Sequence, residues 1–131
     1  MKRRIKSSKN HERGAVAVEF ALVAPILVSL IIAVVEFSNA YNIQVSVTQA
    51  SREAARTMAI TNDSSKATAA GKAGAPSLDT SKLSFSYSGA CAAGSPPPTV
   101  TVTTTYSGQS LTGFFGSSLT VTGKGAMQCN G

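Results

Sequence analysis

The sequence predicts an α+β protein in which a long N-terminal transmembrane and amphipathic helix precedes a small antiparallel β head of about three strands. Residues 15–35 form an apolar run, residues 43–58 carry apolar side chains at helical spacing, and the second half of the chain alternates apolar and polar residues. We therefore expect a basic leader at residues 1–14, a helix at residues 15–60 and an extracytoplasmic β-rich head at residues 61–131.

The first fourteen residues carry most of the positive charge. The chain has a formal net charge of +6, of which the leader contributes +5. Its six basic residues and one acid are Lys2, Arg3, Arg4, Lys6, Lys9, Arg13 and Glu12. Basic residues directly before an apolar run are typical of the cytoplasmic side of a spanning helix. A nucleic-acid-binding arm is the alternative, but no basic or aromatic surface follows it, so we expect no nucleic-acid partner.

Residues 15–35 are long enough to cross a membrane. A helix of this length spans about 30 Å, the thickness of a hydrocarbon core, and Glu19 is its only charged residue. Pro25 removes one backbone hydrogen bond, so we expect a bend or a locally melted turn there. Beyond this transmembrane segment the helical period continues as an apolar stripe with polar residues on the other faces. The stripe consists of Ile43, Val47, Ala50, Ala54 and Met58.

The head begins after a break at residues 61–64, which have helix-capping chemistry, and a weak alanine-rich helix is expected at residues 65–72. Two strands with one apolar face each follow at residues 83–87 and 100–106, and a weaker third strand begins near Leu119. A sheet of three short strands is marginal alone. We therefore expect its inner face to pack on the helical stripe.

An apolar loop separates the second and third strands. It contains Leu111, Phe114 and Phe115, with Gly113 and Gly116 beside them. These side chains form either an exposed anchor for a partner or a lid on the core. Apolar loop residues in small domains more often fill the core, so we expect a lid.

Two cysteines, Cys91 and Cys129, lie on the far side of the apolar run, where an exported domain meets an oxidising compartment. A disulfide is the favoured interpretation and would stabilise the fold by roughly 4 kcal/mol in the chain-entropy model, whereas two free thiols are the alternative. We expect no metal and no cofactor, because structural zinc needs four ligands and the one histidine, His11, lies in the leader. Outside the helix only Asp63 and Asp79 are acidic, so we do not expect an enzyme.

The most informative window runs from Arg13 to Phe20. A basic leader, Gly14, four apolar residues, Glu19 and an aromatic residue follow in that order. A carboxylate near the membrane end of a spanning segment is costly unless it meets a cation, which marks Glu19 as functional. This window resembles the type IV prepilin signal. In that family a membrane aspartyl peptidase cuts after the glycine, so the resemblance implies a processing site at Gly14 and Ala15.

Cutting after Gly14 would create an α-amino cation at Ala15, one helical turn from the Glu19 carboxylate. The resemblance implies an assembly site at Glu19 and Phe20, in which the carboxylate pairs with this amino group or with that of a neighbouring subunit. One alternative is a glutamate that snorkels to the interface in an uncleaved anchor. Another is a secretory cut after Ala40, which is disfavoured because the apolar run exceeds the about 7 to 15 residues of an ordinary signal core.

Two further segments extend the resemblance, and they are Glu36-Phe37-Ser38-Asn39-Ala40 and Gln49-Ala50-Ser51-Arg52-Glu53-Ala54-Ala55-Arg56. Together with the window they are similar to the helix of the TadE-like pseudopilins of tight-adherence (Flp pilus) systems. The charged and aromatic residues of this helix motif are Glu36, Phe37, Arg52, Glu53 and Arg56. The cysteine pair and a proline-rich loop depart from the family.

The resemblance implies a minor pilin-like structural or assembly component of a Tad/Flp adhesion pilus. Its expected partners are a prepilin peptidase, other pilin-like subunits and the Tad assembly machinery. We expect a single-pass protein of the inner (cytoplasmic) membrane with a cytoplasmic N-terminus and an extracytoplasmic head. The resemblance fits a subunit that enters the surface pilus, one that caps it and one that guides its assembly. The alternative is a membrane-anchored extracytoplasmic binding module with an uncleaved signal anchor.

Overall fold

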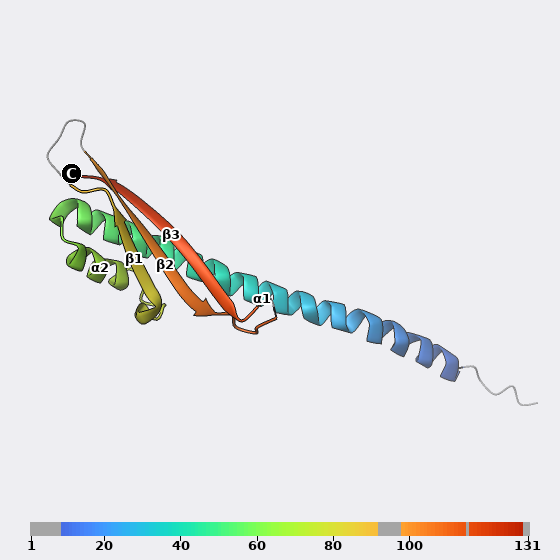
Figure 1. Cartoon of the computed structure of the whole chain (residues 1–131). Helices are drawn as coiled ribbons and strands as arrows, with labels where there is room; N and C mark the ends of the chain where they lie inside the picture. The colour runs from blue at the N-terminus through green and yellow to red at the C-terminus, as the bar shows by residue number, and fades with distance from the viewer. Residues whose placement is uncertain (1–8, 92–97, 115, 130–131) are drawn as a thin grey trace, which may run out of the picture. The chain divides into compact units, whose positions relative to one another are not determined.

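The computed structural model describes residues 9–91, 98–114 and 116–129, with side chains from residue 13 onward. Most of the predicted leader and Phe115 therefore lie outside the described residues. The elements follow one another as α1 (Lys9–Thr61), α2 (Ser64–Ala73), the 3-10 turn η1 (Thr80–Lys82), β1 (Leu83–Ser88), β2 (Thr99–Gln109) and β3 (Ser118–Gln128). The predicted α+β class is confirmed, and Figure 1 shows the elements in order.

Helix α1 covers the predicted apolar run and the predicted stripe without interruption. The locally melted turn expected at Pro25 is absent, because the residues on both sides of it remain helical. Proline removes only its own N–H, so the neighbouring helical hydrogen bonds can persist around it. One turn later the hydroxyl of Ser29 donates to the carbonyl oxygen of Ile26 at 2.7 Å.

The chain divides into two compact units, residues 1–35 and residues 36–131. In its described part the first unit is a single helical segment, the N-terminal portion of α1. The second unit contains the rest of α1, together with α2 and the sheet.

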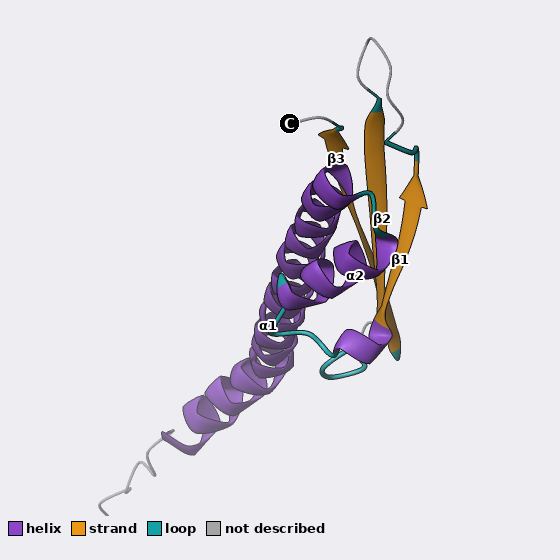
Figure 2. Cartoon of the chain, turned by 90° about the vertical axis from the view of Figure 1, so that its left-hand side faces the viewer, coloured by secondary structure: helices purple, strands orange, loops and turns teal. Residues whose placement is uncertain are grey.

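The sheet is antiparallel, with the strand order β1-β2-β3. Leu83 on β1 and Val121 on β3 both pair with Tyr106 of β2, so the three side chains share one face. This inner face is covered by the second half of α1 and by α2, which Figure 2 shows on the same side of the sheet. The outer face carries mainly serine and threonine hydroxyls, which interact well with water.

The core of the second unit forms where α1 meets the inner face of the sheet. Ile43, Val47 and Ala50 of the stripe pack with residues of all three strands, and Ala54 packs with Val102. These four of the five stripe residues are buried, and the fifth, Met58, is partly buried. The prediction that the sheet packs on the helical stripe is confirmed.

Small residues let strand β3 approach the backbone of α1 closely. A Cβ atom added at Gly125 would lie 2.5 Å from the carbonyl oxygen of Ser51, and one added at Gly123 would lie 2.9 Å from that of Val47. Neither distance leaves room for a side chain. The buried Ser51 satisfies its own hydroxyl by donating to the Val47 carbonyl at 2.9 Å, so it adds no unpaired polar group to this contact.

Helix α2 begins where the sequence predicts capping chemistry. The Asp63 carboxylate accepts hydrogen bonds from the backbone N–H groups of Ser65 and Lys66 at 2.9 and 3.2 Å. Thr68 fixes the helix against β1, because its hydroxyl lies 2.7 Å from the phenolic oxygen of Tyr87. The predicted short helix and all three predicted strands are confirmed.

The expectation that the loop between β2 and β3 forms a lid is wrong for its described residues. Leu111 and Phe114 are 61% and 59% exposed. The stripe of α1 already fills the inner face of the sheet, so the core needs no covering from this loop. Hydrogen bonds from the loop go instead to Glu36.

Candidate functional site

The predicted processing and assembly residues lie on neighbouring turns of α1. Gly14, Ala15, Glu19 and Phe20 are all helical and exposed. Ala15 and Glu19 are four residues apart, which places their Cβ atoms about 5–6 Å from each other on one helix face. An amino group at Ala15 would therefore be within reach of the Glu19 carboxylate.

Gly14 is not required by the described structure. No atom lies within 4 Å of a Cβ added there, and its φ angle is not in the left-handed region. Glycine in a helix interior costs about 0.8–1 kcal/mol relative to alanine. The described fold thus gives no packing or conformational reason for a glycine at this position.

The surface around these residues is apolar on all sides. Twelve large apolar side chains between residues 16 and 35 are exposed, and they are Val16, Val18, Phe20, Leu22, Val23, Ile26, Leu27, Val28, Leu30, Ile31, Val34 and Val35. Exposing one such side chain fully to water costs about 1.5–3 kcal/mol. Within the described chain, one helix is long and apolar enough to cross a membrane, and it runs from Arg13 to Thr61.

Glu19 is the one acid in this apolar surface. The ion pairs of the described side chains join Lys66 with Asp63 and Lys82 with Asp79, and neither involves Glu19. A carboxylate in a spanning segment is stabilised by a nearby cation. Among the described residues, no such cation forms an ion pair with Glu19.

Glu36 has partners from the opposite end of the sequence. Its Oε2 atom accepts hydrogen bonds from the backbone N–H of Thr112 at 3.2 Å and from the Thr112 hydroxyl at 3.1 Å. The pKa of Glu36 lies below its ordinary value, and the Ser110 hydroxyl lowers it most. The hydrogen bonds from Thr112 lower it further. The carboxylate thus fixes the loop between β2 and β3 to α1.

The remaining residues of the helix motif point away from the core. Phe37 is 74% exposed, and Arg52, Glu53 and Arg56 are exposed as well. Arg52 and Glu53 line an open groove between α1 and α2, whose other side is formed by Ala70 and Ala73 of α2 and by Gly74 directly after it. The small residues of the same motif, Ala50, Ser51, Ala54 and Ala55, are fully buried. One face of the motif therefore builds the core while the other presents charges.

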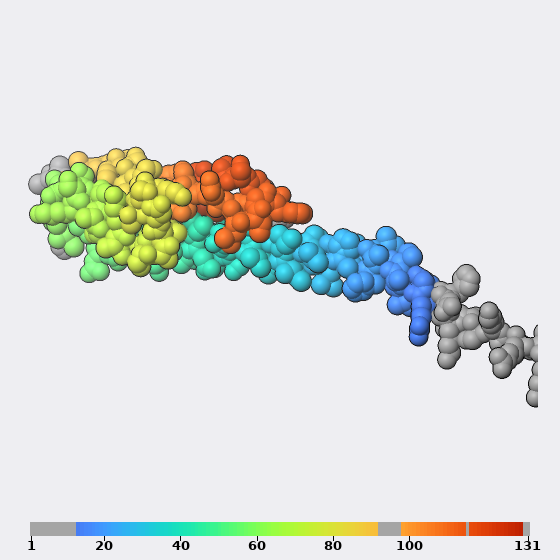
Figure 3. Space-filling view, turned by 90° about the horizontal axis from the view of Figure 1, so that it is seen from below, coloured from blue at the N-terminus to red at the C-terminus, as the bar shows by residue number. Residues whose placement is uncertain are grey.

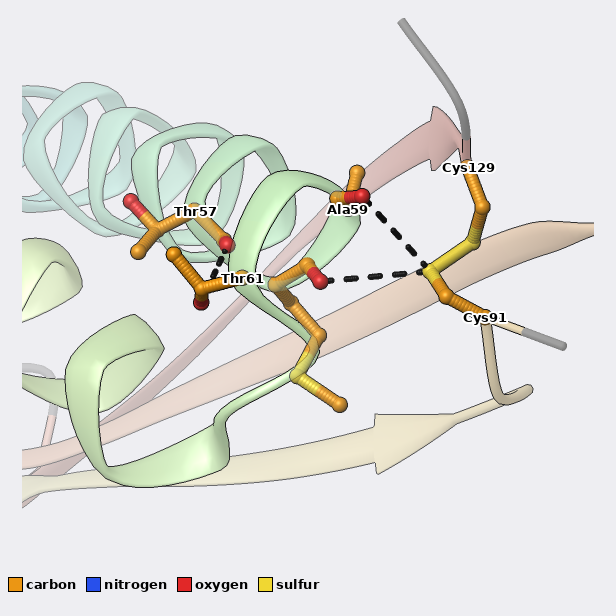
Figure 4. Close-up of a disulfide and its surroundings, with 6 residues drawn as sticks. Thr57, Ala59, Thr61, Cys91 and Cys129 are labelled. Atoms are coloured by element: carbon orange, nitrogen blue, oxygen red, sulfur yellow. Dashed lines mark hydrogen bonds between the residues drawn. A yellow bond between two sulfur atoms is a disulfide. The ribbon is translucent and has the colours of Figure 1, made fainter.

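The predicted disulfide between Cys91 and Cys129 is present, with the Cα atoms 5.4 Å apart. It joins the chain just after β1 to the end of β3, beside the last turn of α1 (Figure 4). The Cys91 sulfur lies 3.9 Å from the carbonyl oxygens of Met58 and Ala59. A bridged sulfur carries no proton, so these are contacts and not hydrogen bonds. A disulfide suggests an extracytoplasmic head.

Sequence reasoning missed two groups of residues. Ser110 and Thr112, which bind Glu36, stand more than seventy residues away from it in the sequence, and no local pattern connects them. Gly123 and Gly125 were detectable in principle, because paired glycines inside a strand signal a close backbone approach.

The fold and the site define a class: a protein with one N-terminal apolar helix whose continuation supports a small, disulfide-bridged α+β head. Residues 14–56 match the family model described as TadE-like protein, so the N-terminal region of the chain is a TadE-like domain. The match begins at Gly14 and includes Glu19 and the helix motif. No curated protein and no solved structure matches the chain. The family consists generally of pilin-like structural proteins and implies a role in pilus assembly.

Proposed function

We propose that this chain is a minor pilin-like component of a Tad/Flp adhesion pilus, which a prepilin peptidase processes after Gly14. Before assembly the protein crosses the inner membrane once, with its N-terminus in the cytoplasm and its head outside. Its partners are the peptidase, other pilin-like subunits and the Tad machinery. The TadE-like domain and the apolar surface of α1 support this proposal.

The proposed processing step is supported by two observations, one at Gly14 and one at Glu19. The fold does not need the glycine, and the carboxylate lacks an ion-pair partner among the described residues. Cleavage after Gly14 would account for both, because it uses the glycine for recognition and creates a cation at Ala15. The carboxylate then pairs with this amino group or with that of an adjacent subunit.

The mature N-terminus tests the processing step. The full chain is expressed with and without a prepilin peptidase, and its N-terminus is determined by mass spectrometry. Ala15 as the first residue supports the proposal, Tyr41 indicates a secretory cut, and Met1 indicates a permanent anchor. Gly14→Leu should block cleavage without disturbing the helix, since there is open space around residue 14. Ala21→Leu, on the exposed helix beyond the Arg13–Phe20 window, is the matched control and should be cleaved normally.

The role of Glu19 is tested separately from cleavage. Glu19→Gln removes the charge and keeps the size, so membrane insertion should be retained while co-assembly with other pilin-like subunits falls. Glu53→Gln is the control, because Glu53 is exposed on α1 and lies outside the apolar run. Normal assembly of Glu19→Gln would refute the pairing role.

A membrane-anchored binding module with an uncleaved anchor is the second candidate. The exposed Leu111 and Phe114 favour it, since exposed apolar loop residues mark contact surfaces. Retention of Met1 in the presence of the peptidase would select this candidate.

A further inference from the structure

The loop between β2 and β3 presents apolar side chains without any charge. Leu111 and Phe114 are 61% and 59% exposed, and no residue from Ser107 to Ser118 is charged. Gly113 has a φ of +70°, a conformation that glycine adopts readily. The loop is thus shaped to expose apolar groups and not to bury them.

Internal hydrogen bonds link residues 110–114 of this loop to one another. The backbone N–H of Gly113 donates to the Ser110 hydroxyl at 2.8 Å, and that of Phe114 donates to the Thr112 hydroxyl at 3.3 Å. The Thr112 hydroxyl also donates to the Glu36 carboxylate at 3.1 Å, and the Ser110 hydroxyl lowers the pKa of Glu36. The two exposed side chains therefore stand on a segment that is fixed to α1 at residue 36.

The position of Glu36 indicates where along α1 the loop between β2 and β3 is attached. Glu36 follows directly after residue 35, the last residue of the apolar run. Thr112 is hydrogen-bonded to it at 3.1–3.2 Å, so the loop lies beside the residue that directly follows the apolar run. In Figure 3 the orange end of the β2–β3 hairpin lies against the turquoise part of α1.

Aromatic residues of α1 lie close to Glu36 along the helix axis. Phe37 and Tyr41 are 74% and 62% exposed, and they lie within about 8 Å of Glu36 along the helix axis. Aromatic side chains are enriched at the level of lipid headgroups, where an apolar ring meets a polar layer.

We propose that Leu111 and Phe114 insert into the outer interface of the lipid bilayer, where with Phe37 and Tyr41 they form an interfacial collar around the exit of the helix. The inference rests on the proposed membrane span. An uncharged apolar loop tied to the residue that directly follows the apolar run fits lipid better than a distant protein partner. The collar gives the head a second membrane contact besides the helix, and this contact restricts rotation of the head about the helix axis.

Tryptophan fluorescence can test the collar, because the chain contains no tryptophan. The full chain carrying Phe114→Trp is reconstituted at high dilution in phosphatidylcholine vesicles, with and without lipids brominated on the upper acyl carbons. Leu27→Trp reports on the span, and Gln128→Trp reports on an exposed position at the end of β3. We expect brominated lipid to quench Phe114→Trp at least twofold more than Gln128→Trp, and iodide to quench it less.

The outcomes separate the collar from the span. Strong quenching of Leu27→Trp with Phe114→Trp behaving like Gln128→Trp would overturn the collar and leave the span intact. Absence of quenching at Leu27→Trp would overturn both. Protection of Phe114→Trp from iodide without lipid quenching would indicate a protein neighbour and also overturn the collar. Leu111→Trp is an independent second reporter and should behave like Phe114→Trp.

The tether to Glu36 gives the inference a further test. Glu36→Ala in the Phe114→Trp background removes the acceptor of both Thr112 hydrogen bonds, so lipid quenching should fall by about half or more. Glu53→Ala in the same background is the control and should leave quenching unchanged. Unchanged quenching after Glu36→Ala would refute the role of the tether in setting the depth of the loop.

Discussion

Replacement of Gly125 by alanine should destabilise the head, because β3 there touches the backbone of α1. The added Cβ would lie 2.5 Å from the carbonyl oxygen of Ser51, about 0.9 Å short of the 3.4 Å at which ordinary contact begins. The obstacle is backbone on both sides, so no rotamer change can relieve the clash. Overpacking of this kind costs about 1–3 kcal/mol, and we expect the upper end of that range.

Two effects of the substitution oppose each other. Replacing glycine also restricts the unfolded chain, which stabilises the protein by about 0.4–1 kcal/mol. The net loss for Gly125→Ala is therefore about 2 kcal/mol. At Gly123 the added Cβ would be only about 0.5 Å too close to the Val47 oxygen, at 2.9 Å, so we expect a net loss below about 1 kcal/mol.

Thermal and urea unfolding of the full chain in detergent measures this series, with tyrosine fluorescence reporting on the head. A loss of 2 kcal/mol should lower the Tm by about 8–16 °C in a domain of this size. Thr122→Ala, on the exposed outer face of β3, is the control and should change stability by less than about 0.5 kcal/mol. A Gly125→Ala protein as stable as the wild type would refute the close approach of β3 to α1.

Three further predictions concern the head. Reducing the bridge between Cys91 and Cys129, which closes a separation of 38 residues, should lower the free energy of unfolding by about 4 kcal/mol, as urea curves with and without reductant would reveal. Thr104→Val should raise stability by about 1 kcal/mol, because the buried hydroxyl lacks a hydrogen-bond partner among the described residues, whereas the outer-face control Thr105→Val should give no such gain. Folding lowers the pKa of Glu36 from its ordinary value of 4.5, so its contribution to stability is complete above pH 4.5 and is lost as the pH falls through the folded-state pKa. Amide exchange in the loop between β2 and β3 should therefore accelerate at that pH. An exchange rate that does not change when Glu36 is replaced would contradict this.

Periodicity was sufficient to predict most of the fold. The three-and-four spacing of Ile43, Val47 and Ala50 identifies a face that the structure buries against the sheet, because an apolar stripe on a helix must be covered. The alternation around Val100 and Val102 likewise identifies the inner face of β2. These are local patterns, and each needs only its own segment to be recognised.

Long-range pairings were harder to predict. The position of both cysteines beyond the apolar run favoured a disulfide. A disulfide also requires Cα atoms at bridging distance, and the folded sheet provides this by placing them 5.4 Å apart. The loop was mispredicted because the apolar character of Leu111 and Phe114 indicates burial in water-soluble domains. In the described structure both side chains are instead exposed. Its tether to Glu36 joins residues 76 positions apart and leaves no local signature.

Two acids lie near the two ends of the apolar run, and they differ in the groups that interact with their carboxylates. Glu36, directly after the run, receives hydrogen bonds from the backbone N–H and the hydroxyl of Thr112, and its pKa is lowered. Glu19, near its start, has no ion-pair partner among the described residues. The carboxylate of Glu36 thus fixes the loop between β2 and β3 to α1, whereas a carboxylate in a spanning segment is stabilised by a nearby cation. This difference explains why the proposed assembly contact lies at Glu19, where cleavage after Gly14 would supply the missing cation.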